Sequence, residues 1–152
     1  MPRYGLLIVG GNLTHQENYS RALAADPRVR LLGLTDESDI PARRRELNVA
    51  LAAELGVEYI EPYSEALSRE DVDLVCLCPE PERRARMTVA AAVAGKHVYV
   101  DKPLCTTRQG ARDVVAAVAA SRVRSQMFSL VRSSVARRCR RVLQSGRLGR
   151  LI

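Results

Sequence analysis

Residues 95–103 have the sequence Gly-Lys-His-Val-Tyr-Val-Asp-Lys-Pro, which joins a helix end, a short strand and a polar strand end. Gly95 follows an apolar helical run, where a glycine commonly terminates a helix. Residues 98–100 are β-formers, and Pro103 ends the strand because it lacks an N–H and disfavours helical geometry at Lys102. Because open parallel sheets bind ligands beyond the carboxyl ends of their strands, Lys102 is expected at a ligand-binding edge. A solvated surface lysine is the alternative that this stretch alone leaves open.

Strand-like and helix-like segments alternate along the whole chain. Predicted strands cover 4–9, 29–35, 57–60, 72–78, 97–100 and 123–130, and predicted helices cover 16–25, 41–55, 64–67, 82–94, 107–121 and 133–144. Alternation of this kind is typical of a parallel sheet whose strands are joined by right-handed crossovers. We therefore predict an α/β fold: a doubly wound, mostly parallel sheet between two helical layers, in a three-layer αβα arrangement.

The charge of the chain is concentrated near its end. The 152 residues carry a formal net charge of +7, almost entirely from arginine, and no acidic residue follows Asp113. Such a basic tail can bind nucleic acid, or it can be a helix face that pairs with an acidic partner. Without interleaved aromatic side chains or a nucleic-acid-binding motif, nucleic acid is the disfavoured partner.

Cysteine spacing and hydropathy indicate whether the protein binds a metal and where in the cell it is expected. The cysteines at 76, 78, 105 and 139 have no usual zinc-ligand spacing, so we expect no metal site and four reduced thiols. The apolar run 6–9 is too short for a signal peptide, and no segment approaches a membrane span. The expectation is a cytoplasmic protein that does not contact a membrane.

A glycine-containing turn follows the first predicted strand. Gly10, Gly11, Asn12 and Leu13 stand where a dinucleotide-binding fold brings backbone N–H groups and a helix N-terminus onto a pyrophosphate. The match to Gly-x-Gly-x-x-Gly is incomplete, because Asn12 occupies the second glycine position and His15 the third. Asparagine tolerates the left-handed conformation, so the turn remains compatible with the fold. An ordinary tight turn between strand and helix is the open alternative.

Polar residues also follow the second, fourth and fifth predicted strands. Asp36 lies about 26 residues after Gly10, near the position of a ribose-binding acid. A carboxylate there accepts hydrogen bonds from ribose hydroxyls and repels a 2′-phosphate, which favours NAD over NADP. The segments 78–80 (Cys78, Pro79, Glu80) and 101–103 (Asp101, Lys102, Pro103) border the same edge, where they would face the nicotinamide half.

Three motifs resemble the amino-terminal domain of the glucose–fructose oxidoreductase/inositol dehydrogenase (Gfo/Idh/MocA) family. Residues 94–104 are similar to the family's Ala-Gly-Lys-His-Val-x-x-Glu-Lys-Pro-Leu, and residues 73–79 to its Asp-x-Val-x-Ile-x-Thr-Pro. Residues 143–149 resemble the segment that leads into the family's second domain. The resemblance implies a Rossmann-like dinucleotide-binding domain over 1–130. It also implies that 131–152 form a connecting helix and the start of a truncated or missing substrate domain.

The resemblance also implies roles for individual residues. The lysine of the family's Glu-Lys-Pro reaches the nicotinamide ribose and the substrate, and this catalytic role carries to Lys102. The cofactor-binding set then comprises Gly10, Gly11, Asn12, Leu13, Asp36, Cys78, Pro79, Glu80, Asp101, Lys102 and Pro103. The sequence departs from the family pattern at Asp101 (family Glu), Cys78 (family Thr) and Arg83 (often His in the family).

These observations predict the NAD(P)-binding domain of an oxidoreductase. It would transfer hydride between the nicotinamide cofactor and a sugar, cyclitol or related hydroxy compound. Because the substrate domain is absent from this chain, activity of the chain itself is left open. A non-catalytic nucleotide-sensing or assembly module is the alternative. A homo-oligomer is expected, because uncovered apolar residues such as Phe128, Leu130, Val142 and Leu151 would drive association.

Overall fold

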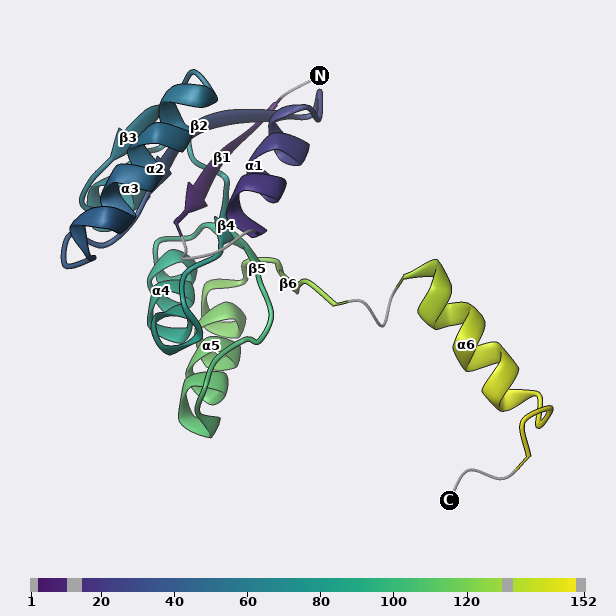
Figure 1. The fold of residues 1–152 in the computed structure, drawn as a ribbon. Helices are drawn as coiled ribbons and strands as arrows, with labels where there is room; N and C mark the ends of the chain where they lie inside the picture. The colour runs from purple at the N-terminus through teal and green to yellow at the C-terminus, as the bar shows by residue number, and fades with distance from the viewer. Residues whose placement is uncertain (1–2, 11–14, 130–132, 150–152) are drawn as a thin grey trace.

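The computed structural model describes residues 3–10, 15–129 and 133–149, in which strands and helices alternate (Figure 1). The strands are β1 (Tyr4–Val9), β2 (Val29–Thr35), β3 (Glu58–Ile60), β4 (Leu74–Leu77), β5 (His97–Val100) and β6 (Ser125–Met127). The helices are α1 (His15–Ala24), α2 (Ala42–Glu54), α3 (Tyr63–Ser68), α4 (Pro81–Val93), α5 (Arg108–Ser121) and α6 (Ser134–Gln144).

The six strands form one sheet in the order β3-β2-β1-β4-β5-β6, and every neighbouring pair is parallel. The order reverses between β1 and β4, because the chain builds one half outward through β2 and β3 and then returns to β1 to build the other. This arrangement confirms the predicted doubly wound sheet. The carboxyl ends of β1 and β4 form the topological switch point at which such sheets bind ligands.

Helical layers cover both faces of the sheet, and β1 shows how the sequence produces them. Residues 5–9 are all buried, as expected for a central strand of a parallel sheet. Leu7 and Val9 pack in a cluster with residues of α3 and α4, whereas Leu6 and Ile8 pack in a second cluster with residues of α1 and α2. Successive side chains of a strand point to opposite faces, so one apolar run anchors both layers.

Helix ends follow the predicted capping chemistry. Thr107 caps α5, because its side-chain oxygen accepts a hydrogen bond from the Gly110 N–H at 3.0 Å. Gly95 closes α4 with φ of +76°, a conformation in which glycine carries no side-chain penalty. The apolar spacing within α5 predicts that Val114, Val115 and Val118 are buried. Val114 is 5% exposed, but the prediction is wrong for Val115, which is 66% exposed.

The last described segments are less buried than the rest. β6 covers only 125–127 instead of the predicted 123–130, and all three of its residues are exposed. No residue of α6 is buried, and Figure 1 shows this helix set apart from the sheet. Phe128 and Val142 are half-buried, whereas Leu130 and Leu151 lie outside the described residues. In the described ranges, no helix combines the length and the apolar character needed to cross a membrane.

The two faces of α4 predict a clear contrast in stability. Met87 is 1% exposed and Val93 is 71% exposed. We expect Met87→Ala to lower the free energy of unfolding by about 2–4 kcal/mol, because it removes buried apolar surface and leaves a cavity. Val93→Ala is the matched control and should change stability by less than about 0.5 kcal/mol. Urea denaturation measures both, and equal losses would contradict the packing of α4.

Candidate functional site

Backbone hydrogen bonds join the ends of four strands at one edge of the sheet. The Gly10 N–H after β1 donates to the Thr35 carbonyl at the end of β2, with a distance of 2.8 Å. On the other side of β1, the Cys78 N–H donates to Val9 at 3.3 Å, and the Asp101 N–H after β5 donates to Leu77 at 2.9 Å. The structure therefore brings Gly10, Asp36, the 78–80 segment and the 101–103 segment to the same edge. Gly11, Asn12 and Leu13 lie outside the described residues.

Gly10 is a position at which only glycine fits. A Cβ atom there would lie 2.4 Å from Asn48 Nδ2 and 2.7 Å from Asp36 Oδ2, both inside van der Waals contact. Gly10 itself is buried. The glycine therefore lets the acid after β2 approach the backbone after β1, so the first two strand ends form one compact unit.

The sequence alone also allows Asp36 to be a solvated loop acid, but this alternative is wrong because its side chain is fully buried. Its Oδ1 accepts from the Glu37 N–H at 2.8 Å and from Arg83 Nη1 at 2.7 Å. Its Oδ2 accepts from Asn48 Nδ2 at 3.3 Å and from Arg83 Nη2 at 3.4 Å. A carboxylate has about four lone-pair sites. Any further donor to Asp36 would therefore have to replace one of these four.

Arg83 of α4 is the donor best placed for such an exchange. Its guanidinium also contacts Glu37 Oε2 at 3.0 Å and Glu80 Oε2 at 2.6 Å, so it keeps two carboxylate partners without Asp36. Burial raises the pKa of Asp36 above its usual value, and the Arg83 hydrogen bonds offset this only in part. Burial lowers the pKa of Arg83, but hydrogen bonds to the surrounding carboxylates outweigh it and raise that pKa overall.

Asp101 and Lys102, at the end of β5, have opposite environments. Asp101 is 5% exposed, with Oδ2 2.9 Å from His15 Nδ1 and Oδ1 3.4 Å from the Tyr19 hydroxyl. Burial and the nearby Asp101 carboxylate both raise the pKa of Tyr19. The Lys102 side chain is exposed at the sheet edge, and the peptide bond from Lys102 to Pro103 is cis. Lys102 thus carries an accessible ammonium group and directly follows a residue whose carboxylate is fixed.

The 78–80 segment contributes a thiol, a carbonyl and a carboxylate. Cys78 follows β4 and is buried, and its Sγ lies 3.9 Å from Cys76 Sγ, so the two thiols lie on the same side of the sheet. The hydrogen bond to Cys78, together with burial, raises the pKa of Cys76. The Pro79 carbonyl accepts from Arg84 Nη2 at 2.6 Å. All four cysteines are free thiols.

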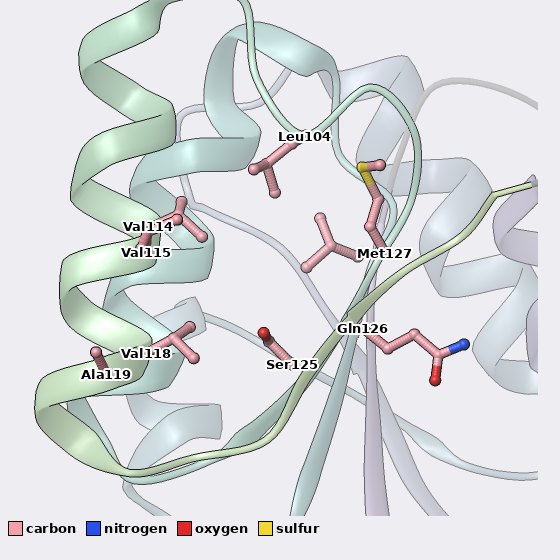
Figure 2. A pocket seen from close by; sticks show the side chains of 9 residues that line it. Leu104, Val114, Val115, Val118, Ala119, Ser125, Gln126 and Met127 are labelled. Carbon is pink, nitrogen blue, oxygen red and sulfur yellow. The ribbon is translucent and has the colours of Figure 1, made fainter.

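The cavities of the molecule differ in their relation to this edge. One, of about 340 Å³, lies between α5 and β6 and is lined mainly by apolar side chains, among them Leu104, Val114 and Met127 (Figure 2). It contains none of the candidate site residues. A second cavity, of about 270 Å³, opens near Asp36 and is lined by Asp39, Ile40, Pro41, Glu80 and Arg83. Among the described residues, no group of three or more histidine, cysteine or acidic side chains could hold a metal ion.

Sequence reasoning missed four residues that shape the site. Asn48 and Arg83 hold the Asp36 carboxylate, whereas His15 and Arg84 hold Asp101. Arg83 and His15 were visible only as departures from a motif, and their partners lie 47 and 86 residues away in sequence. For Arg84, the available signal was a charged residue within the apolar pattern of a helix that must pack on a sheet.

Arg83 and Arg86 pair with carboxylates of different burial, so removing each arginine should cost a different amount of stability. Arg83→Ala removes the cation that pairs with the buried Asp36 carboxylate. We therefore expect the free energy of unfolding at pH 7 to fall by about 2–4 kcal/mol. Arg86→Ala breaks a more exposed pair with Glu37 and should cost about 0–1 kcal/mol. Urea denaturation of the two variants measures the difference. Similar small losses in both would refute a tightly coupled Arg83–Asp36 pair.

Comparison with known proteins places this geometry in a family. The family model described as "Oxidoreductase family, NAD-binding Rossmann fold" (GFO_IDH_MocA) matches residues 4–129. The chain is 36% identical over 109 residues to 1,5-anhydro-D-fructose reductase of Ensifer adhaerens, covering 70% of the chain and 33% of the relative. It is 31% identical over 98 residues to inositol 2-dehydrogenase of Pseudomonas savastanoi pv. phaseolicola, covering 63% of the chain and 29% of that relative.

A solved structure shares the fold over nearly the whole chain. The crystal structure of GenD2 from gentamicin A biosynthesis, in complex with NAD, superposes with a TM-score of 0.83 at 24% identity. The match covers 97% of this chain and 40% of GenD2. The chain spans no more than about a third of the length of the curated relatives it matches. On the family match over residues 4–129, the chain belongs to the Gfo/Idh/MocA oxidoreductase family and carries its NAD-binding Rossmann fold.

Proposed function

We propose that this chain is the cofactor-binding part of an oxidoreductase that transfers hydride between NAD and a sugar, cyclitol or related hydroxy compound. The observation that carries the proposal is the placement of Asp36 and Lys102 at one edge of the sheet, on either side of the switch point between β1 and β4. A dinucleotide has two halves, and this edge offers a polar group for each. The sugar reductase and the cyclitol dehydrogenase among the relatives support the substrate class.

The residues present fit the adenosine half of NAD. Because Gly10 has no side chain, the buried Asp36 carboxylate lies directly against the backbone where β1 ends. Asp36 would hold the ribose hydroxyls, and the residues of the 270 Å³ cavity would surround the adenine. The turn residues Gly11, Asn12 and Leu13 are proposed, from their sequence, to offer N–H groups to the pyrophosphate.

The residues after β4 and β5 would hold the nicotinamide half and the reacting group. Bound NAD supplies the hydride acceptor. The exposed Lys102 ammonium has three N–H donors and would orient the reacting oxygen of the substrate, stabilise negative charge on it and hold a proton for it. Cys78, Pro79 and Glu80, with Asp101 and Pro103, would line this half of the site.

The charges around Asp36 support NAD over NADP. Three carboxylates, from Asp36, Glu37 and Glu80, surround the Arg83 guanidinium, and Arg86 adds a second cation through Glu37. The carboxylates at this point would repel a 2′-phosphate on the ribose. Arg83 is already engaged by carboxylates and would have to leave them to bind a phosphate.

The proposal extends to the organisation of the whole protein. Residues 131–152, including α6, would connect the cofactor domain to a second domain that completes the substrate site. A homo-oligomer and a cytoplasmic location belong to the same proposal, the latter supported by the four free thiols. Because the relatives named above are a reductase and a dehydrogenase, an enzyme is better supported than a sensing or assembly module.

Calorimetry with NAD and NADP tests the proposal on this chain. The wild type should bind NAD more tightly than NADP, and Asp36→Asn should weaken NAD binding at least tenfold, about 1.4 kcal/mol. The loss is expected because the amide carries no charge to attract the ribose hydroxyls.

Glu54→Gln is the control for the calorimetry. Glu54 lies at the carboxyl end of α2, which runs back to the opposite edge of the sheet, and its side chain is exposed and paired with Arg21. This variant should bind NAD as the wild type does. If the folded wild type binds neither cofactor, the proposed function is wrong.

A further inference from the structure

Arg84 is a buried cation whose guanidinium joins two loops of the candidate site. Its side chain projects from α4 and the residue is 3% exposed. Nε and Nη2 donate to the Pro79 carbonyl at 3.1 and 2.6 Å. Nη1 donates to the Asp101 carbonyl at 3.2 Å and also to the Pro103 carbonyl. Nη2 lies 3.8 Å from Asp101 Oδ2. One planar group therefore binds the loop after β4 and the loop after β5.

Burying a guanidinium is costly, so its presence here needs a compensating role. A cation removed from water loses its hydration, and carbonyl oxygens replace that hydration only where their geometry matches the donors. Burial lowers the pKa of Arg84, as expected for a cation that is incompletely compensated by full negative charges. An apolar side chain of similar volume would pack on the sheet without this cost. The cost of burying Arg84 is therefore better explained by the functional residues on the two loops that it joins.

The two loops carry the residues expected to face the nicotinamide. The carbonyls of Asp101 and Pro103, both bound by Arg84, stand on either side of Lys102 in the chain. The Lys102 side chain is exposed. Arg84 therefore restrains the backbone on both sides of Lys102 and leaves its side chain accessible. The fork of N–H donors on arginine suits several acceptors in one plane, whereas the point charge of lysine does not.

Asp101 is also contacted from the opposite face of the sheet. His15 and Tyr19 of α1 contact the Asp101 carboxylate at 2.9 and 3.4 Å, whereas Arg84 reaches the Asp101 carbonyl from α4. The two helices belong to different layers, because Tyr19 packs with one core cluster and Met87 of α4 with the other. Asp101 is thus held from both sides, and Lys102 follows it directly.

We propose that Arg84 is a positioning residue that fixes Lys102 relative to Pro79 in the nicotinamide half of the site. This inference rests on the proposed function. It makes a specific prediction about ligands: Arg84 should matter for NAD but not for AMP, because AMP engages only the Gly10 and Asp36 half. A role confined to folding would instead affect both ligands alike.

Calorimetry with NAD and AMP tests the split in folded variants. In Arg84→Met, which keeps the apolar stem and removes the guanidinium, NAD binding should weaken about tenfold while AMP binding changes less than twofold. Arg84→Lys should behave in the same way, because a compact ammonium group cannot span the loop after β4 and the loop after β5 as the planar guanidinium does. Arg86→Met on the same helix is the matched control, since Arg86 is exposed and pairs with Glu37. It should leave the ratio of NAD to AMP affinity unchanged.

The two lysines of the chain allow a direct measurement at Lys102. Reductive ¹³C-methylation labels Lys96 and Lys102, and the Lys96 amine donates to the Arg69 carbonyl at 2.8 Å, away from the ligand edge. In the wild type, NAD should shift the NMR signal of Lys102 and leave that of Lys96 in place. In Arg84→Met, saturating NAD should shift the Lys102 signal by less than half as much.

Each outcome decides between the alternatives. Equal losses of NAD and AMP affinity, an unchanged NAD affinity, or an undiminished Lys102 response in Arg84→Met would overturn the positioning role. Failure of both Arg84 variants to fold would also overturn it, in favour of a structural role alone. A wild type that binds neither NAD nor AMP would instead remove the proposed function, so the two failures are distinguishable.

Discussion

The parallel pairing of β1 with both β2 and β4 is the constraint on which the rest of the molecule depends. Because all strands run the same way, every carboxyl end reaches one edge, and each loop that leaves this edge can contribute to one site. The hydrogen bonds from Gly10 to Thr35, from Cys78 to Val9 and from Asp101 to Leu77 make this edge continuous. Residues separated by more than sixty positions in sequence thereby become neighbours.

Neighbouring arginines on α4 show how this edge accommodates buried charge. Arg83 neutralises a carboxylate, Asp36, whereas Arg84 is satisfied mainly by backbone carbonyls of two loops. Both solutions supply acceptors in place of water, which a buried cation requires. The start of α4 follows the end of β4 and so lies beside the switch point. From there Arg83 reaches the half of the edge after β2, and Arg84 reaches the half after β5. The start of this one helix therefore contacts both the acid after β2 and the loop after β5.

The sequence predicts the backbone frame of this site better than its side-chain partnerships. The positions of Gly10, Asp36 and Lys102 follow from where apolar runs end, because strand ends are marked locally by glycine, acid and proline. The partners of Asp36 and Asp101 come from helices 12 to 86 residues away, and no local pattern encodes such contacts. The exposure of Val115 was missed for a related reason. The small and apolar residues of α5 do not show which side of the helix packs on the sheet, and only the position of the helix in the fold does.

Two departures from the family pattern are in contact with each other. His15 stands where the third glycine is expected and Asp101 where a glutamate is expected, and His15 Nδ1 lies 2.9 Å from Asp101 Oδ2. A glycine at 15 would leave the Asp101 oxygen without this partner inside a largely buried setting, which is unfavourable for a carboxylate. The missing glycine is therefore better understood as one half of a link than as the decay of a motif. Through this link the start of α1, which follows the glycine-containing turn in sequence, is tied to the residue that precedes Lys102.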